Sequence, residues 1–326
     1  MSIVSVVMPV YNAAEFLRSS IDSILNQSLT DLEFIIINDG STDTSHNIIS
    51  SYTDPRIKYI NKQKNQGLVK CLNEAIEIAN GPYIARMDAD DIAYKDRLTM
   101  QVSYLQQNKH VKLVGAHVRL IDINSKPFGT WRYPTSLIDV KKEIKNRCCF
   151  AHPSVVFEKN IFNELGGYYP ILVAEDYDLW VRILNKYEGI NLDCILTDYR
   201  IHSTNYSSTH LLKQSLACLA IKYNIPANCE VDLPYLSKNG LSEIEIVNHV
   251  VNSFLFWIEV YRKMRDPKTS DNLLSNLKSF LNKMTNNNKA NILVLKYEIK
   301  YSFFLLRFAT VVRLYYQYLY LIIGQN

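Results

Sequence analysis

The segment Met87-Asp88-Ala89-Asp90-Asp91 places three carboxylates close together. Two carboxylates one residue apart in a loop can share a divalent cation, because Mg²⁺ and Mn²⁺ prefer oxygen ligands and keep positions open for phosphate oxygens. A cation held there would neutralise charge on a departing phosphate group. An Asp-x-Asp pair is also common by chance and suits an acidic turn that faces solvent. Asp88 and Asp90 therefore need support from the rest of the chain.

A second acidic cluster, Glu175-Asp176-Tyr177-Asp178-Leu179-Trp180, opens a predicted helix. Acids in a first helical turn are favourable for electrostatic reasons alone. A carboxylate at this position can also remove a proton from a hydroxyl group. The preceding Gly166-Gly167 permits a tightly turned approach to the helix. This cluster by itself leaves both interpretations open.

Two histidines are candidates for a site. His202 follows an apolar strand within Tyr199-Arg200-Ile201-His202-Ser203 and can complete a metal site or bind a phosphate oxygen. A lone histidine is more often a surface or core residue, so His202 also depends on its neighbours. His152 precedes Pro153-Ser154 and is a candidate pocket residue.

Strands and helices alternate from Ile3 to Met87, which predicts an α/β fold with a parallel sheet and helices on both faces. The predicted strands are Ile3–Pro9, Glu33–Asn38, Ile57–Asn61 and Tyr83–Met87, and the predicted helices include Ala14–Gln27 and Val69–Ala79, with Asp43 or Thr42 capping another. Ligands bind beyond the carboxyl ends of such strands. Tyr11-Asn12, Asp39-Gly40-Ser41 and the Asp88 cluster should therefore meet along one edge.

The pattern after Asp91 is mixed and then helical. The predicted elements are helices at Asp96–Asn108, Ile138–Asn146 and Asp176–Asn185, a strand or hairpin arm at Lys112–Ile123, and strands at Ser154–Phe157 and Ile190–Arg200. From Leu211 onward the chain is predicted to be helical, with breaks near Pro226–Pro234 and Asp266–Ser270 and a buried or interface helix at Leu241–Met264. We therefore predict a catalytic domain over residues 1–210 and a helical region over 211–326.

These motifs together resemble family 2 of the inverting, GT-A-fold glycosyltransferases, of the bacterial type that elongates lipopolysaccharide or capsule glycans. The matching pieces, in order from Ser5 to about Asn205, are Val7-Met8-Pro9-Val10-Tyr11-Asn12; Ile37-Asn38-Asp39-Gly40-Ser41-Thr42-Asp43; Asn65-Gln66-Gly67-Leu68; Ala85-Arg86-Met87-Asp88-Ala89-Asp90-Asp91; Gly166-Gly167-Tyr168; Glu175-Asp176-Tyr177-Asp178-Leu179-Trp180; and His202. The order and spacing carry the resemblance, since each piece is weak alone. It implies a Rossmann-like, mostly parallel sheet.

The resemblance also implies residue roles. Pro9, Tyr11 and Asn12 would lie at the nucleotide base and ribose, Asp39 would hydrogen-bond a uracil base, and Asn65 and Arg86 would lie near the nucleotide. Asp88 would contact the ribose or metal-bound water, and Asp90 with His202 would hold Mn²⁺ or Mg²⁺. Asp176 would be the catalytic base with support from Glu175, and His152 and Trp180 would belong to the acceptor pocket.

The implied reaction is one in-line displacement in which an acceptor hydroxyl attacks the anomeric carbon of a UDP-sugar. The transferred sugar would be a hexose or N-acetylhexosamine, and the acceptor a glycan or glycolipid. Asn38 replaces the first acid of the family's Asp-Asp-Gly-Ser, and Leu72-Asn73 stands where many relatives have Arg-Asn. The missing arginine removes a donor contact that Arg86 can replace.

Composition narrows the function classes. The formal net charge of +4 is too small to indicate nucleic-acid binding. The six cysteines contain no Cys-x-x-Cys pair, and reduced thiols in a cytoplasmic protein are the expected state. No signal peptide is recognisable, and no apolar run is long enough to cross a bilayer.

The tail Val294–Ile323 is rich in aromatic and aliphatic residues and is interrupted by Arg307 and Arg313. Such a helix can lie on an anionic membrane, which suits a lipid-linked acceptor at the inner face of the plasma membrane. It can equally pack on the catalytic domain or on a second subunit of a homodimer.

Two other functions remain open at this point. A nucleotidyltransferase uses similar carboxylates but is expected to have a glycine-rich phosphate loop after the first strand, where this chain has Val10-Tyr11-Asn12-Ala13-Ala14. A non-catalytic sugar-binding homologue is disfavoured because every catalytic position is filled.

Overall fold

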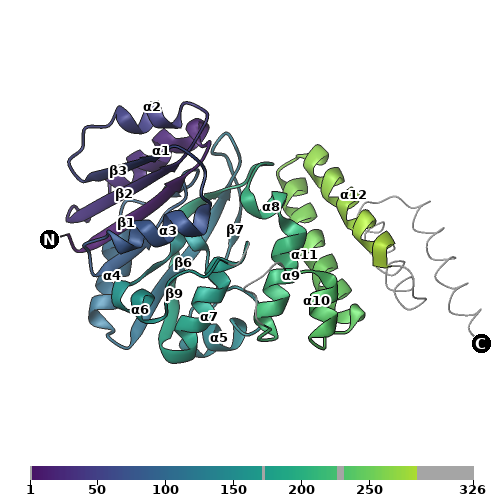
Figure 1. The fold of residues 1–326 in the computed structure, drawn as a ribbon. Helices are drawn as coiled ribbons and strands as arrows, with labels where there is room; N and C mark the ends of the chain where they lie inside the picture. The colour runs from purple at the N-terminus through teal and green to yellow at the C-terminus, as the bar shows by residue number, and fades with distance from the viewer. Residues whose placement is uncertain (1, 171–172, 226–230, 285–326) are drawn as a thin grey trace, which may run out of the picture. The chain divides into compact units, whose positions relative to one another are not determined.

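The computed structural model describes residues 2–170, 173–225 and 231–284 (Figure 1). The chain divides into two compact units. The first contains Met1–Asn205 and Ile221–Glu230, and the second contains Tyr206–Ala220 and Val231–Asn326.

The first unit is built around one mixed sheet. Its strands are β1 (Val4–Val10), β2 (Leu32–Asp39), β3 (Ile57–Lys62), β4 (Tyr83–Arg86), β5 (Ile92–Ala93), β6 (Val111–Ile121), β7 (Pro127–Trp131), β8 (Val156–Glu158) and β9 (Glu188–Arg200). Its helices are α1 (Ala14–Leu25), α2 (Ser45–Ser50), α3 (Leu68–Glu77), α4 (Arg97–Gln107), α5 (Leu137–Glu143), α6 (Lys159–Glu164) and α7 (Glu175–Lys186), with a 3₁₀ turn, η1, at His152–Ser154.

The sheet has the order β3-β2-β1-β4-β8-β6-β9-β5, and β7 pairs with β6. The strands from β3 to β4 are parallel, as predicted, and their ends fall within two residues of the predicted ones. The strand order reverses at β1, which has β2 on one side and β4 on the other. A ligand crevice is expected at the carboxyl ends of strands where the order reverses. The tips of β1, β2 and β4 therefore form the predicted polar edge.

The later half of the sheet is mixed. β8 runs antiparallel to both β4 and β6, whereas β6 and β9 are parallel along most of their length. The short β5 pairs antiparallel with β9, with Ile92 opposite Asp198. β5, β7 and α6 have no clear signal in the sequence, because these elements are too short to show an apolar period and the two strands depend on their pairing partners.

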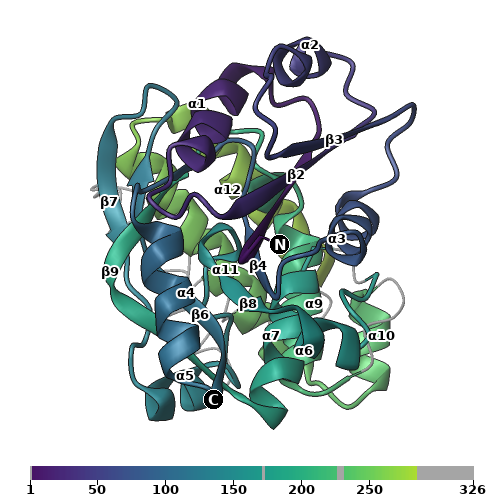
Figure 2. The same ribbon diagram turned by 90° about the vertical axis from the view of Figure 1, so that its left-hand side faces the viewer.

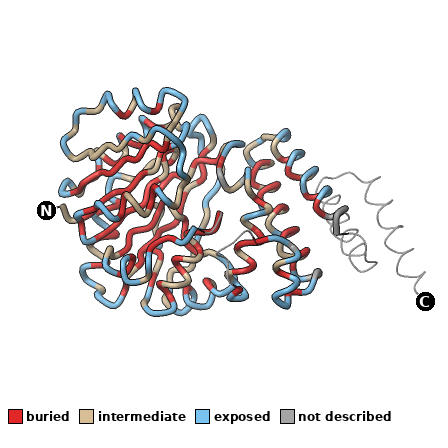
Figure 3. The backbone as a smooth tube through the Cα atoms, in the orientation of Figure 1, coloured by how far each residue is buried: buried red, intermediate tan, exposed pale blue. Residues whose placement is uncertain are grey.

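Helices cover both faces of the sheet, which confirms the predicted α/β architecture (Figure 2). α1, α2 and α4 lie on one face, where Leu17, Ile49 and Leu98 join a buried cluster with Phe34 and Val156. α3, α6 and α7 lie on the other face. Figure 3 shows that β1 and β2 are almost wholly buried, in agreement with their continuous apolar sequences.

The turn after β2 differs in one detail from the prediction. Thr44 is the N-cap of α2 and makes no side-chain cap. Asp43 instead accepts hydrogen bonds from the backbone of Ser45 (3.0 Å) and from Ala14 at the start of α1 (3.0 Å). Asp43 thus joins two helix starts.

The helices that follow Asn205 are α8 (Tyr206–Thr209), α9 (Leu211–Lys222), α10 (Leu233–Lys238), α11 (Glu243–Lys263) and α12 (Pro267–Met284). The predicted helix Leu241–Met264 is confirmed as α11, which begins with a capping box between Ser242 and Glu245. The break predicted at Asp266–Ser270 is shorter, because Pro267 is the first residue of α12.

Within the described residues, no helix has both the length and the apolar character needed to span a membrane. The tail Val294–Ile323, predicted to contact a membrane, the catalytic domain or a second subunit, lies outside the described residues.

Candidate active site

The pairing of β5 with β9 brings the Asp88–Asp91 loop to His202. His202 Nε2 lies 2.9 Å from Asp90 Oδ2, although the two residues are far apart in the sequence. The His202 backbone N–H donates to Asn205 Oδ1 (2.6 Å), and Asn205 Nδ2 lies 3.4 Å from the same Asp90 oxygen. The structure therefore joins two residues that the resemblance assigned to one metal site.

The acidic loop has the donor set of a divalent-cation site. One carboxylate oxygen from each of Asp88, Asp90 and Asp91 lies within 4.8 Å of the others. Asp91 Oδ1 accepts the Arg200 backbone N–H at 2.8 Å, and its buried Oδ2 has no hydrogen-bond partner among the described residues. Burial and the neighbouring carboxylates hold the pKa of Asp91 well above its ordinary value. An oxygen-rich group of this kind fits Mn²⁺ or Mg²⁺.

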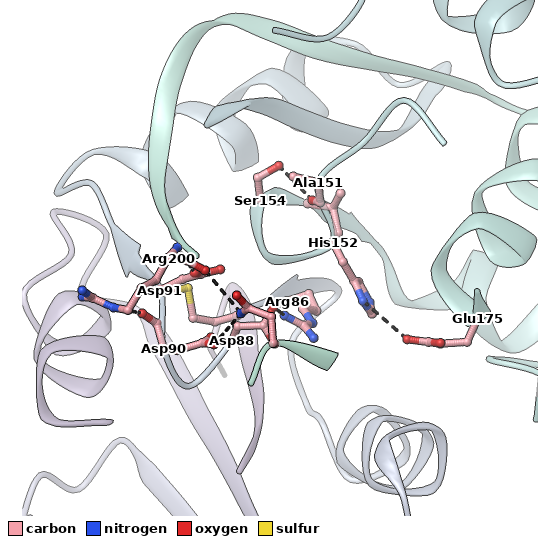
Figure 4. A network of polar contacts seen from close by, with 12 residues as sticks. Arg86, Asp88, Asp90, Asp91, Ala151, His152, Ser154, Glu175 and Arg200 are labelled. Atoms are coloured by element: carbon pink, nitrogen blue, oxygen red, sulfur yellow. Dashed lines mark hydrogen bonds and ion pairs between the residues drawn. The ribbon is translucent and has the colours of Figure 1, made fainter. Parts of the chain in front are cut away.

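Arg86 ends β4 directly beneath this loop. Its side chain is 3% exposed and forms an ion pair with the Asp88 carboxylate (Figure 4). Burial opposes the charged guanidinium, but Asp88 more than offsets this and raises the pKa of Arg86 above its ordinary value. Arg86 is therefore a fixed positive charge at the carboxyl end of the parallel strands.

Asp39 shapes the loop that carries Asn65. Its carboxylate is 3% exposed, and its two oxygens accept the backbone N–H groups of Gln66 and Gly67, each at 2.8 Å. Gly40 adopts a φ of +70°, and a Cβ there would lie 2.6 Å from the backbone of Lys64. The contacts of Asp39 in this structure are thus with the protein backbone, and any contact with a base would add to them.

The end of β1 presents an exposed aromatic ring. Tyr11 is 51% exposed. Asn12 has a φ of +50°, its Oδ1 accepts the Thr42 N–H at 2.8 Å, and its own N–H donates to Ser41 Oγ at 2.9 Å. Pro9, two residues before Tyr11, is partly buried. Asn12 therefore fixes the backbone next to Tyr11. The Tyr11 residue lies at the carboxyl edge of the parallel strands, beside the turn that follows β2.

The acidic start of α7 is a different environment. Glu175 is buried and Asp176 is half-buried, and Asp176 Oδ1 accepts the Tyr177 N–H at 2.7 Å. Burial and the adjacent Asp176 raise the pKa of Glu175 to about 8, and burial raises the pKa of Asp176. Both carboxyl groups therefore hold a proton more readily than exposed acids.

His152 faces the same helix start. Its Nδ1 lies 3.8 Å from Glu175 Oε1, as Figure 4 shows, and its Nε2 lies 2.9 Å from Tyr168 Oη. Trp180, assigned from the sequence to the acceptor pocket, is fully buried and packs edge-on against His152 with 5.9 Å between ring centroids. Trp180 therefore packs against the His152 ring inside the protein and does not line an open surface.

Comparisons with known proteins agree with this geometry. The family model described as glycosyl transferase family 2 matches residues 5–166. The O-antigen biosynthesis glycosyltransferase WbnJ of Escherichia coli is 35% identical over 228 residues, which cover 68% of this chain and 89% of that protein. The chain belongs to glycosyl transferase family 2.

A second relative is named UDP-Glc:alpha-D-GlcNAc-diphosphoundecaprenol beta-1,3-glucosyltransferase WfgD, also from Escherichia coli. It is 31% identical over 208 residues, which cover 63% of this chain and 80% of that protein. Among solved structures, the mannosyltransferase PcManGT from Pyrobaculum calidifontis, in complex with GDP-Man and Mn²⁺, has a TM-score of 0.56 at 16% identity, covering 98% of this chain and 87% of that chain. This last likeness establishes the fold, and the predicted GT-A fold and glycosyltransferase class are confirmed.

The site of this glycosyltransferase also contains residues whose part the sequence did not reveal. Arg200 is 1% exposed, and its side chain donates to the backbone oxygens of Asp90 and Asp122, at 2.8 and 2.9 Å. Arg97 is fully buried and donates to the Arg86 carbonyl at 2.8 Å. Arg200 therefore holds the backbone of the acidic loop, and Arg97 holds the end of β4 just before that loop. A charged residue in a sequence pattern does not by itself indicate burial, so no sequence signal separates them from surface arginines.

Proposed function

We propose that this glycosyltransferase transfers a hexose or N-acetylhexosamine from a UDP-sugar to a hydroxyl of a growing bacterial surface glycan, with inversion and with Asp176 as base. One observation carries the proposal: the fold brings His202, just after β9, to Asp90 in the three-carboxylate loop, beside the Arg86–Asp88 ion pair at the end of β4. A direct displacement at an anomeric carbon also requires a base, and Asp176, whose pKa burial raises, is the proposed one.

The donor is proposed to bind along the carboxyl ends of β1, β2 and β4. Pro9, Tyr11 and Asn12 would contact the base and ribose, with Asp39 and Asn65 beside them. The exposed ring of Tyr11 supports a stacking contact with a base. The name of WfgD includes UDP-Glc and supports a uracil base, whereas PcManGT was solved with GDP-Man, and the assay below separates the two donors.

Asp88, Asp90 and His202 are the residues proposed to hold Mn²⁺ or Mg²⁺. The three clustered carboxylates and the imidazole against Asp90 support this assignment. A bound divalent cation would neutralise the charge that develops on the leaving diphosphate. Arg86 lies at the same strand end and contributes a second positive charge to that region.

In the proposed reaction the acceptor hydroxyl oxygen forms a bond to the anomeric carbon while the bond from that carbon to the diphosphate oxygen breaks. The electron pair leaves with UDP, and Asp176 takes the hydroxyl proton. Attack opposite the leaving group converts an α-linked donor into a β-linked product. The burial that raises the pKa of Asp176 favours proton uptake by this carboxylate.

The acceptor is proposed to enter beside His152 and α7. We further propose that residues 1–210 carry catalysis and that residues 211–326 contact either the cytoplasmic face of the membrane or a second subunit. The names of WbnJ and WfgD, which refer to O-antigen and to a diphosphoundecaprenol acceptor, support a lipid-linked glycan.

A release assay for the nucleotide diphosphate tests this function. The full chain, with Mn²⁺ and a lipid-linked glycan pool, is expected to release UDP from one of UDP-Glc, UDP-Gal, UDP-GlcNAc or UDP-GalNAc. Turnover with GDP-mannose alone would refute the uracil assignment. Release of pyrophosphate would favour a nucleotidyltransferase, and UDP binding without turnover under every condition would favour a non-catalytic homologue.

A further inference from the structure

A hydrogen-bonded pair joins α3 to the loop before α7. The Asn73 carboxamide donates from Nδ2 to the Tyr168 carbonyl (2.9 Å) and accepts at Oδ1 from the Tyr168 N–H (3.0 Å). Gly167 has a φ of +74°, and a Cβ there would lie 3.0 Å from the same Asn73 oxygen. One side chain therefore fixes both backbone polar groups of Tyr168, and the neighbouring glycine makes this approach sterically acceptable.

Tyr168 passes this restraint to His152. The Tyr168 hydroxyl lies 2.9 Å from His152 Nε2, and Tyr168 is 2% exposed. Phe162 packs edge-on against the Tyr168 ring (5.4 Å between centroids), and Trp180 packs edge-on against both the Tyr168 and His152 rings. The imidazole is held on several sides and has little freedom to rotate.

His152 in turn faces Glu175 with its second ring nitrogen, 3.8 Å from Oε1. Burial and the positive charge of Arg86 lower the pKa of His152 well below its usual value, so the ring is neutral. In a neutral imidazole one ring nitrogen donates a hydrogen bond and the other accepts one. The contact with Tyr168 therefore determines whether the nitrogen that faces Glu175 carries the proton. Besides each other, Glu175 and Asp176 have Arg86 and Asp88 at the end of β4 as the charged groups that act on them, whereas Arg182 of α7 acts on Tyr168.

We propose that Tyr168 and His152 are positioning residues, which hold Glu175 so that Asp176 alone is free to accept the acceptor proton, and that Asn73 anchors this chain of contacts to α3. The proposal rests on the proposed function, because it assigns the base role to Asp176. α3 begins at the loop that Asp39 holds and that carries Asn65. The chain of contacts thus links the nucleotide-binding loop to the position of the base.

The test compares Tyr168→Phe with the neighbouring Tyr169→Phe in the full chain. The first variant removes a buried hydroxyl, whereas Tyr169 is 42% exposed and its hydroxyl makes only a 3.5 Å contact with the Leu165 carbonyl. Tyr168→Phe should lower kcat about tenfold, since a base displaced by a fraction of an ångström is inefficient. It should leave KM for the donor within about twofold and displace the pH profile of kcat, whereas Tyr169→Phe should match the wild type.

Equal kcat and equal pH profiles for the wild type and Tyr168→Phe would refute the proposal. A fall in kcat with an equally large rise in the KM for the donor and an unchanged pH profile would also refute it, because that pattern indicates a general loosening of the site. His152→Gln, which keeps a polar side chain of similar length, should reproduce the displaced profile if the chain of contacts acts as proposed.

A spectroscopic readout separates this inference from the proposed function. The ¹⁵N shifts of the His152 ring, assigned by comparison with His152→Gln, should report a neutral imidazole at pH 6 with one tautomer in excess. Tyr168→Phe should change that tautomer ratio, and Tyr169→Phe should not. Unchanged shifts refute the positioning network even if the enzyme transfers sugar, whereas changed shifts with no turnover by the wild type refute the proposed function alone.

Discussion

The two sides of the proposed active site hold their carboxyl groups in different surroundings. On the proposed donor side, at the ends of β1, β2 and β4, Asp88 pairs with Arg86, Asp90 with His202 and Asp39 with two backbone N–H groups, whereas one buried oxygen of Asp91 has no partner among the described residues. On the acceptor side, at the start of α7, Glu175 and Asp176 stand side by side with a neutral histidine.

The difference indicates what each side is built to bind. On the donor side, partners fix the carboxylates of Asp39, Asp88 and Asp90, and the grouped oxygens of Asp88, Asp90 and Asp91 can hold a cation. At the start of α7, burial raises the pKa of Asp176, which favours proton uptake by a general base. The following predictions test this contrast.

The largest effect is expected from Asp176→Asn on the acceptor side. Loss of the base should lower kcat about 10³-fold, within the range typical of general-base removal. UDP binding, measured by calorimetry, should stay unchanged because the donor side is intact. Asp96→Asn, on an exposed residue before α4, serves as the matched control and should turn over like the wild type. Near-normal turnover by Asp176→Asn would remove Asp176 from its role.

On the donor side, Asp90→Ala should weaken Mn²⁺-dependent UDP binding about 10- to 100-fold, since a ligand of a metal site is lost. The measurement is a UDP titration with and without Mn²⁺. His202→Gln should give a smaller loss in the same direction, and His110→Gln, at a histidine whose side chain is 60% exposed, should give none. Identical metal dependence in Asp90→Ala and the wild type would contradict the metal assignment.

Glu175 should make the folded state sensitive to pH. Its pKa is raised to about 8 in the folded protein, so its contribution to stability is full below about pH 4.5 and is lost as the pH rises toward 8. Glu175→Gln removes this titration. Its free energy of unfolding, relative to the wild type, should therefore increase by about 4 kcal/mol between pH 5 and pH 8.5, at about 1.4 kcal/mol per pKa unit. Parallel denaturation curves for both proteins at every pH would show that Glu175 is not the titrating group.

The smallest effect is expected at the exposed Tyr11. Replacement by alanine should weaken UDP binding about 3- to 10-fold, the amount expected for loss of one aromatic stacking contact. Tyr11→Phe keeps the ring and should bind like the wild type. A full loss of binding in Tyr11→Ala would show that the donor side depends on this ring for its structure as well.

The donor side could be predicted from the sequence to a large extent because its residues follow directly from parallel strands. A strand such as β2 is apolar until its last residues, and the polar residues that come next must lie at the carboxyl edge. Asp39, Asp88 and Asp90 could thus be placed on one edge before any coordinates. Their partners could not be predicted in the same way, because no local pattern indicates that Asp39 binds the backbone of Gln66 and Gly67.

The acceptor side depended on the tertiary structure. The acidic start of α7 fits both a favourable helix start and a base, and the sequence does not reveal that Glu175 is buried beside His152, the feature on which the proposed base role depends. Trp180 was expected at a pocket surface and is instead covered. The sequence pattern marks Asn73 only as the residue next to a missing arginine, whereas its two contacts to Tyr168 arise from the packing of α3 against a loop far along the chain.

The sequence by itself therefore determined the family, the parallel half of the sheet and the acidic motifs, because these depend on local patterns of apolar and polar residues. Only the tertiary structure decided which charges are paired and which are crowded. Charge compensation and the pKa of each carboxyl group depend on through-space neighbours such as Arg86 and on the exclusion of water. Those neighbours come from elements that the chain brings together only when it folds.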